Sequence, residues 1–271
     1  MTDDIDQPRH AYQNRSFLDS RAGRPLRILS EYIEPFTRFE QYRIEDTVVF
    51  MGSARTRSRE TALAELEVAR RDGGDVAFAE RQLDLSKHYE AARTLAFRLT
   101  EWSKGLGEGE RRFVVCTGGG PGIMEAANRG ASEAGGMNVG LTISIPIEEF
   151  NNPYITRELH FSFHYFFMRK FWFLYLAKAV VIYPGGFGTL DELFEILTLV
   201  QTGKMRKRLP VVLFGADYWN EVVNFDALVR HGTISERDVD LIFRTDSVDE
   251  AYDYLTRELI AFNLDRPGAV L

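Results

Sequence analysis

Cysteine is nearly absent from this 271-residue sequence, which contains only Cys116. A disulfide within the chain is therefore impossible, and the apolar run around Cys116 predicts a buried strand residue rather than a nucleophile. Long hydrophobic runs are also lacking, because no stretch reaches the roughly 18 uninterrupted apolar residues of a membrane-spanning helix. Residues 1–20 contain no apolar core of the kind that a signal peptide needs. We therefore expect a cytoplasmic protein.

An excess of positive charge is lacking as well. The sequence has 33 Lys and Arg residues against 40 Asp and Glu residues, which gives a net charge of −7. This balance disfavours a nucleic-acid polymer as partner, although a single nucleotide needs only a local positive site. Among the five histidines only His160 and His164 are close together, and they do not form the H-E-x-x-H zinc motif. We expect neither a metal nor a cofactor.

Two common nucleotide-binding motifs are missing. The dinucleotide motif G-x-G-x-x-G fails twice, since Ile123 and Asp191 stand where its third glycine is required. Neither glycine-rich segment ends in the Gly-Lys-Ser/Thr of a P-loop. A dehydrogenase, an ATPase and a kinase are disfavoured accordingly.

Strand-like and helix-like segments alternate along most of the chain. Short apolar runs predict strands over 47–51, 113–117, 138–145, 159–163, 180–183, 209–214 and 240–243. Helical patterns cover 25–42 with a break or kink at Pro35, 57–104 with an interruption near Gly73, 165–176 and 249–262. The alternation predicts an α/β fold, a doubly wound, Rossmann-like parallel sheet with an N-terminal helical extension. We expect an arm and helix over 1–45 and one nucleotide-binding domain over 46–265.

Two glycine-rich loops each follow a predicted strand and precede a predicted helix. The first contains Gly118, Gly119, Gly120 and Gly122, and the second contains Gly185, Gly186 and Gly188 before a helix that opens on Thr189. Glycines let backbone NH groups approach a ligand, and a helix N-terminus attracts anions. With the basic pair Arg169 and Lys170 between them, the loops predict a site for a phosphorylated ligand such as a nucleoside monophosphate.

The first predicted strand ends in a third candidate segment. Gly52, Ser53 and Arg55 follow residues 47–51, and ligands of open α/β sheets collect beyond the carboxyl ends of strands. Ser53 is therefore a further candidate for substrate binding. An ordinary turn between a strand and a helix remains the alternative at this segment.

Two motifs resemble those of the LOG ("lonely guy") family. They are Met168-Arg169-Lys170 and the string P-G-G-F-G-T-L-D-E over 184–192, together with G-G-G-P-G over 118–122. The resemblance covers about 47–262 and implies hydrolysis of the N-glycosidic bond of a nucleoside 5′-monophosphate, AMP-like or a cytokinin nucleotide, to free base and ribose 5-phosphate. It also implies Arg169 and Glu192 as catalytic residues and a homodimer or an assembly of dimers. Plant-like members have Met-His where this chain has Phe166-Phe167, so we expect a general purine or other nucleotide.

Each candidate residue receives a role in this hypothesis. Glu192 stabilises the positive charge that develops on the sugar and activates water. The NH groups of Gly185, Gly186 and Gly188, with the Thr189 hydroxyl, bind the 5′-phosphate, while Arg169 orients the ligand. The glycines of the first loop flank the ribose or phosphate. Lys170 is placed among the substrate-binding residues, although a turn of about 100° per helical residue could direct it to solvent.

Three alternatives stay open. Thr189 and Glu192 have the spacing of a capping box, in which neither residue needs a ligand. A protein of the same fold could bind or sense a nucleotide without cleaving it. A lysine decarboxylase would need pyridoxal phosphate and a Schiff-base lysine.

The predicted helix over 165–176 has aromatic residues nearly all round, so part of its surface is expected to meet a second subunit.

Overall fold

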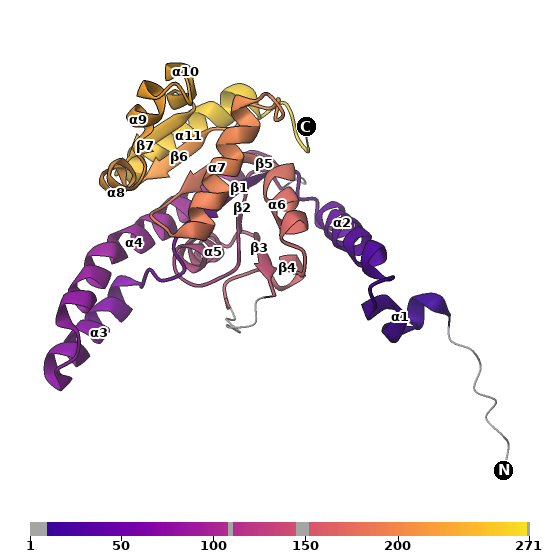
Figure 1. Cartoon of the computed structure of the whole chain (residues 1–271), viewed down its shortest axis with the longest axis horizontal. Helices are drawn as coiled ribbons and strands as arrows, with labels where there is room; N and C mark the ends of the chain where they lie inside the picture. The colour runs from indigo at the N-terminus through magenta and orange to yellow at the C-terminus, as the bar shows by residue number, and fades with distance from the viewer. Residues whose placement is uncertain (1–9, 108–110, 145–151, 270–271) are drawn as a thin grey trace, which may run out of the picture.

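The structure, a computed structural model, describes residues 10–107, 111–144 and 152–269. Its centre is a seven-stranded parallel sheet with the order β4-β3-β2-β1-β5-β6-β7 (Figure 1). The strands are β1 Thr47–Met51, β2 Val114–Thr117, β3 Asn138–Ile143, β4 His160–Phe163, β5 Ala177–Ile182, β6 Val211–Phe214 and β7 Ile242–Thr245. The predicted doubly wound parallel sheet is confirmed. The strand order reverses direction between β1 and β5, which is where such sheets bind ligands.

Helices cover both faces of the sheet. The helices that precede β3 are α1 Arg15–Asp19, α2 Arg24–Gln41, α3 Arg59–Asp72, α4 Val76–Lys104 and α5 Ile123–Glu133. Those that follow it are α6 Phe166–Tyr175, α7 Phe187–Gln201, α8 Ala216–Val222, α9 Phe225–Arg230, α10 Glu236–Val239 and α11 Val248–Phe262. Two short 3-10 helices, η1 Ala11–Gln13 and η2 Arg157–Leu159, complete the described elements. None of the described helices has the length and apolar character needed to cross a membrane.

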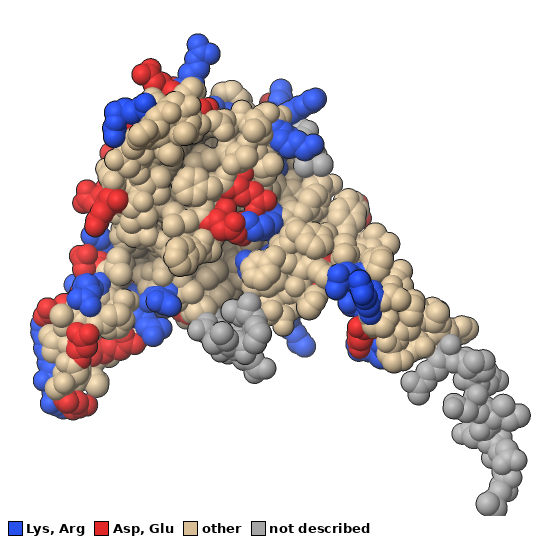
Figure 2. Space-filling view, in the orientation of Figure 1, with Lys and Arg blue, Asp and Glu red and all other residues tan. Residues whose placement is uncertain are grey.

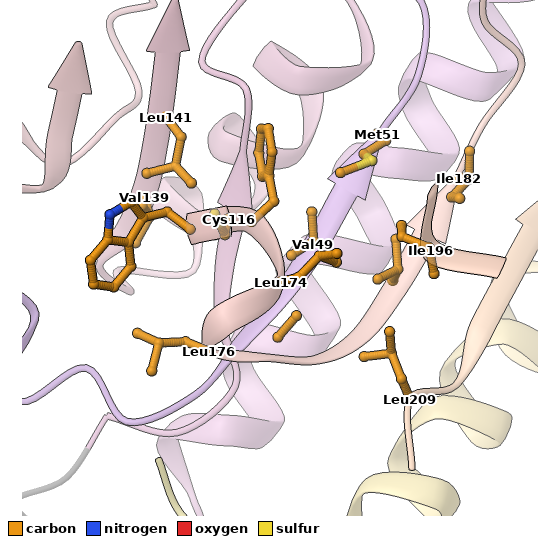
Figure 3. Packing of buried hydrophobic residues seen from close by; sticks show 14 of the residues in the cluster. Val49, Met51, Cys116, Val139, Leu141, Leu174, Leu176, Ile182, Ile196 and Leu209 are labelled. Atoms are coloured by element: carbon orange, nitrogen blue, oxygen red, sulfur yellow. The ribbon is translucent and has the colours of Figure 1, made fainter. Parts of the chain in front are cut away.

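Alternate residues of each strand supply two separate cores. In β1, Val48 and Phe50 pack with α4, α5 and α11, whereas Val49 and Met51 pack with α6 and α7. Side chains of a strand point alternately to opposite faces, so a strand buried on both faces must be apolar throughout. Figure 3 shows the second of these cores, where Val49 and Met51 lie among apolar side chains from the neighbouring strands and helices. Cys116 belongs to the same core and is buried, as predicted.

The N-terminal helix α2 differs from its prediction at Pro35. It runs without a break from Arg24 to Gln41. Proline cannot donate to the carbonyl four residues earlier, which here belongs to Glu31. The indole Nε1–H of Trp172 in α6 donates to that carbonyl at 2.9 Å instead. Of the predicted break or kink, the break is therefore wrong, because tertiary packing satisfies the oxygen that Pro35 leaves without its helical partner.

The helix after the second glycine loop also begins at another residue than expected. Helix α7 begins at Phe187 with Gly186 as its N-cap, two residues before the predicted start at Thr189. The interruption predicted near Gly73 is confirmed, since α3 ends there before α4 begins (Figure 1). Strand β3 ends at Ile143, and its predicted end at residue 145 lies outside the described residues. The division into residues 1–45 and 46–265 stays a prediction.

Candidate functional site

A cleft of about 790 Å³ opens at the carboxyl ends of β1 and β5. This volume is within the roughly 300–1,000 Å³ of small-molecule sites. Its walls come from residues 52–56 after β1, Gly118 after β2, residues 184–190 and Glu192 around the start of α7, Arg169 and Phe173 of α6, Gln82 and Leu85 of α4, and Tyr218 of α8. The cleft therefore lies at the switch point of the strand order.

Ser53 holds the loops around the cleft together. Its backbone NH donates to Pro184 O at 2.9 Å, and its carbonyl accepts from the NH of Ile123 at 3.1 Å. Its hydroxyl accepts from the NH of Arg55 at 3.0 Å. Ser53 lines the cleft as the sequence predicts, and its backbone fixes the relative positions of the two glycine loops.

The first glycine loop is closely packed. Gly119 and Gly122 have positive φ angles of 69° and 70°, which L-residues with side chains rarely adopt. A Cβ atom at Gly122 would lie 2.3 Å from Ser53 O, and one at Gly120 would lie 2.7 Å from Met124 Cε. Only Gly118 of this loop lines the cleft. The structure therefore places Gly119, Gly120 and Gly122 behind the wall.

The second glycine loop is open. A Cβ atom at Gly186 or Gly188 would meet no atom within 4 Å, and both residues line the cleft. Gly185 is the exception, because a Cβ atom there would lie 2.1 Å from Thr189 Oγ1. The hydroxyl of Tyr218 in α8 donates to Gly185 O at 2.6 Å and holds the loop in place.

The start of α7 presents free hydrogen-bond donors to the cleft. The first NH groups of a helix have no partner within it. Leu190 N donates back to Gly186 O, but no hydrogen bond from the NH groups of residues 187–189 occurs within the described part of the chain. A cluster of unpaired NH groups at the positive end of a 15-residue helix suits a phosphate.

The capping-box alternative is wrong. A box would need Thr189 as N-cap, but Gly186 has that position and no side chain caps α7. Thr189 and Glu192 instead lie inside the helix, and both line the cleft although they are only 7% exposed. Neither side chain is occupied by the helix end, so both are free to meet a ligand.

Glu192 and Arg169 lie next to each other in the cleft without a close hydrogen bond. Arg169 Nη2 lies 4.0 Å from Glu192 Oε1. Burial raises the pKa of Glu192 to about 7, against the lowering effect of Lys170 and Arg169. Burial also lowers the pKa of Arg169, which Glu192 opposes. The guanidinium group is 5.3 Å from the ring centroids of Phe166 and Phe173, and its Nε has no hydrogen-bond partner among the described residues.

Lys170 lies beside this pair rather than in solvent. Its Nζ is 2.7 Å from Asp191 Oδ2 and 2.6 Å from Glu195 Oε2, with Glu192 Oε2 at 4.0 Å. Figure 2 shows acidic and basic side chains gathered together over α6 and α7. Burial lowers the pKa of Lys170, but hydrogen bonds with Asp191 and Glu195 raise it overall. Lys170 therefore does not take the solvent orientation that helical spacing allows. It does not line the cleft either, and its substrate-binding role stays a prediction.

Helix α6, which carries the basic pair, is anchored at both ends. The carboxylate of Glu31 in α2 accepts from the NH groups of His164 and Tyr165, just before α6 begins. Nζ of Lys207 donates to the carbonyls of Leu174 and Tyr175 at its end. A carboxylate at the N-terminus and an amine at the C-terminus both complement the helix dipole. The N-terminal extension therefore helps to position Arg169.

Several lining residues were not predicted from the sequence, among them Gln82, Leu85, Met124, Phe173 and Tyr218. Helix spacing gives one signal, since Gln82 interrupts a buried stripe of α4. No comparable signal marks Tyr218, because its contact with the loop depends on how α8 packs. Within the described residues no group of three or more His, Cys, Asp or Glu side chains could hold a metal ion.

Comparisons with known proteins identify similar sequences. A family model described as possible lysine decarboxylase matches residues 124–255. The cytokinin riboside 5′-monophosphate phosphoribohydrolase LOG7 of Arabidopsis thaliana is 33% identical over 102 residues, which cover 33% of this chain and 46% of that protein. The pyrimidine/purine nucleotide 5′-monophosphate nucleosidase of Escherichia coli K12 is 31% identical over 130 residues, covering 43% of this chain and 28% of that protein.

A solved structure is similar in outline. The X-ray structure of TM1055, at 22% sequence identity and a TM-score of 0.47, covers 78% of this chain and 99% of that chain. The two sequence matches each span less than half of the curated relative concerned. Together the family model and these relatives confirm the resemblance that the motifs predict.

Proposed function

From its resemblance to the LOG family, we propose that this protein hydrolyses the N-glycosidic bond of a nucleoside 5′-monophosphate, AMP-like or a cytokinin nucleotide, to free base and ribose 5-phosphate. One observation carries the proposal. The buried Glu192 carboxylate lies in the same cleft as the free NH groups at the start of α7. Residues 187 and 192 are separated by about 7.5 Å along a helix that rises 1.5 Å per residue. This is the scale of a ribose 5-phosphate.

In the proposed mechanism, the phosphate lies on the N-terminus of α7, held by the NH groups of Gly186 and Gly188 and by the Thr189 hydroxyl. The ribose then extends along the helix toward Glu192. A water oxygen bonds to the anomeric carbon, the carbon–nitrogen bond breaks, and its electron pair leaves on the base, which takes up a proton from solvent. Glu192 in its charged form stabilises the cationic sugar and takes the proton of the water. Arg169, beside Glu192, orients the ligand.

Incubation with AMP tests this function, with free adenine and ribose 5-phosphate separated by chromatography. Glu192→Gln should lower the rate by about 10²- to 10⁴-fold, because an amide cannot accept the proton or offset the developing charge. Glu195→Gln, three residues further along α7 and outside the cleft lining, is the matched control and should stay within a few-fold of the parent. A Glu192→Gln protein that folds normally and hydrolyses AMP at the parent rate contradicts the assignment.

Two other functions can be told apart from hydrolysis with the same purified protein. A calorimetric titration in which AMP binds and stays intact would favour a nucleotide-sensing protein. A decarboxylase that uses pyridoxal phosphate fits the site poorly, because no lysine lines the cleft in the described chain and the cofactor forms its Schiff base on a lysine. No step of the proposed mechanism uses that cofactor.

We also propose that the protein forms a homodimer through the surface of α6 and α7. Phe166 and Phe167 are 53% and 55% exposed, and Phe194 of α7 is 40% exposed. Exposed aromatic side chains on neighbouring helices are typical of a protein interface. Analytical ultracentrifugation should give a mass of twice the chain, and Phe167→Glu should shift it toward the monomer. A monomeric parent protein would overturn this proposal. The expected cytoplasmic location stays a prediction.

A further inference from the structure

One polar side chain of α4, that of Gln82, lines the cleft. The other buried residues of this stripe of α4 have small or aromatic side chains. Ala79, Gln82, Ser86 and Tyr89 follow one another at helical spacing and are all buried. Gln82 is 8% exposed, so more than nine-tenths of its surface is covered, and it lines the cleft together with Leu85. The sequence predicts a helix here and no site residue.

The amide of Gln82 lacks a partner. Its Oε1 is one of nine buried side-chain atoms without a hydrogen bond in the described part of the chain. Only two of the nine belong to cleft-lining residues, and the other is Nε of Arg169. A buried polar group without a partner destabilises a fold, so a ligand that supplies the missing partner gains binding energy. The two unpaired groups therefore mark where a ligand completes the structure.

The other lining residues account for the phosphate and the sugar of a nucleotide, so the base is the part that remains for Gln82 to contact. The start of α7 provides the donors for a phosphate, and Glu192, with Arg169 beside it, provides the negative charge for a sugar cation. Gln82 and Leu85 form a neutral stretch of wall from a different helix, α4. An uncharged amide beside an apolar side chain matches a flat, neutral base, with the amide at its edge and Leu85 against its face.

We propose that Gln82 is a specificity-determining residue that recognises the base of the nucleotide through its side-chain amide. The preferred base presents a donor beside an acceptor, as adenine does with its amino group and the adjacent ring nitrogen. The amide oxygen accepts from the amino group, and the amide NH₂ donates to the ring nitrogen. This assignment rests on the proposed function, because it takes the ligand to be a nucleoside monophosphate.

Calorimetric titration with three ligands tests the assignment: AMP, purine riboside 5′-monophosphate, which lacks the amino group, and ribose 5-phosphate, which lacks the base. Each is titrated into the Glu192→Gln protein and into the Glu192→Gln, Gln82→Met protein, so that the nucleotides stay intact. Methionine has a similar length and no amide. With Gln82 present, AMP should bind about ten- to a hundredfold more tightly than the ligand without the amino group. Gln82→Met should remove this preference and leave the affinity for ribose 5-phosphate within twofold.

Three results would overturn the assignment. Gln82→Met could weaken AMP and ribose 5-phosphate equally, which would place Gln82 at the phosphate or the sugar. Gln82→Met could leave the preference for AMP over purine riboside 5′-monophosphate unchanged. Alternatively, the protein that retains Gln82 could show no such preference. The double variant should unfold at no lower a denaturant concentration than its parent, because an apolar side chain replaces an unpaired buried amide. Failure of hydrolysis in the parent protein contradicts the proposed function alone, since these titrations measure binding without turnover.

Discussion

The two glycine loops look alike in the sequence and differ in the structure. Both follow a strand and precede a helix, and both resemble an anion-binding loop. In the first loop, the NH of Ile123 donates to Ser53 O, and added Cβ atoms would collide with neighbouring atoms. In the second loop, Gly186 and Gly188 face open space, and the NH groups that begin α7 have no partner among the described residues. The first loop therefore uses its glycines for packing and the second leaves room for a ligand.

The comparison shows what a glycine means in each position. A glycine is required for the fold where φ is positive or where backbone comes too close for a side chain. A glycine makes room for a ligand where the protein could accommodate a side chain but that side chain would occupy the binding site. Glycine substitutions therefore separate the two uses, because the first kind should change stability and the second kind should change affinity.

The largest effect is expected at Gly122. Gly122→Ala places a methyl group 2.3 Å from Ser53 O at a φ of 70°. Backbone strain and overpacking together should lower the free energy of unfolding by about 2–6 kcal/mol. Urea denaturation measures this loss. Gly73→Ala is the control, since Gly73 has a φ of 72° with nothing within 4 Å, and strain alone should cost about 1 kcal/mol. Equal losses in the two variants would mean that the first loop is not packed as described.

A smaller effect with a different readout is expected at Gly188. Gly188→Ala replaces a glycine inside α7 at a position with open space, so stability should rise by up to about 1 kcal/mol. The added methyl group projects where the phosphate is proposed to lie, and a change of this size in a pocket alters binding by about 10- to 200-fold. Calorimetry with AMP measures the affinity. A stabilised variant that binds AMP like the parent would show that the phosphate lies elsewhere.

Local patterns predicted the fold, whereas contacts between distant segments decided the details. Each strand was predicted within a few residues because apolar runs bounded by glycine and proline are local signals. Helix α2 continues through Pro35 because Trp172, distant in the sequence, satisfies the carbonyl of Glu31. The orientation of Lys170 could not be read from helical spacing, because it depends on the acidic side chains of α7. Spacing alone could not tell a capping box from a cleft residue at Glu192.

The helices that follow the two loops extend the comparison to two carboxylates, the half-buried Glu125 and the buried Glu192. In α5, Glu125 accepts a hydrogen bond from the Tyr89 hydroxyl at 2.7 Å. In α7, no hydrogen bond to the Glu192 side chain occurs among the described residues, and its charged neighbours lie 4.0 Å away. Glu192 therefore has the poorer environment for a charge, as expected where a residue is placed for a ligand rather than for stability.

This difference should appear as a pH-dependent stability, the smallest of the three effects. The pKa of Glu192 is raised from an ordinary 4.5 to about 7 in the folded protein. The folded state therefore binds more protons than the unfolded state between these values, and the stability contributed by the protonated form is lost as pH rises through 7. Glu192→Gln is neutral at every pH, so it should be more stable than the parent by about 1–2 kcal/mol at pH 8, with a smaller gap at pH 5. Urea denaturation at both pH values measures the gap, and Glu125→Gln, which loses a hydrogen-bonded carboxylate, should show no such gain. A gap of the same size at pH 5 and pH 8 would mean that Glu192 titrates like an exposed carboxyl group, and its place as a buried, catalytically poised group would then be untenable.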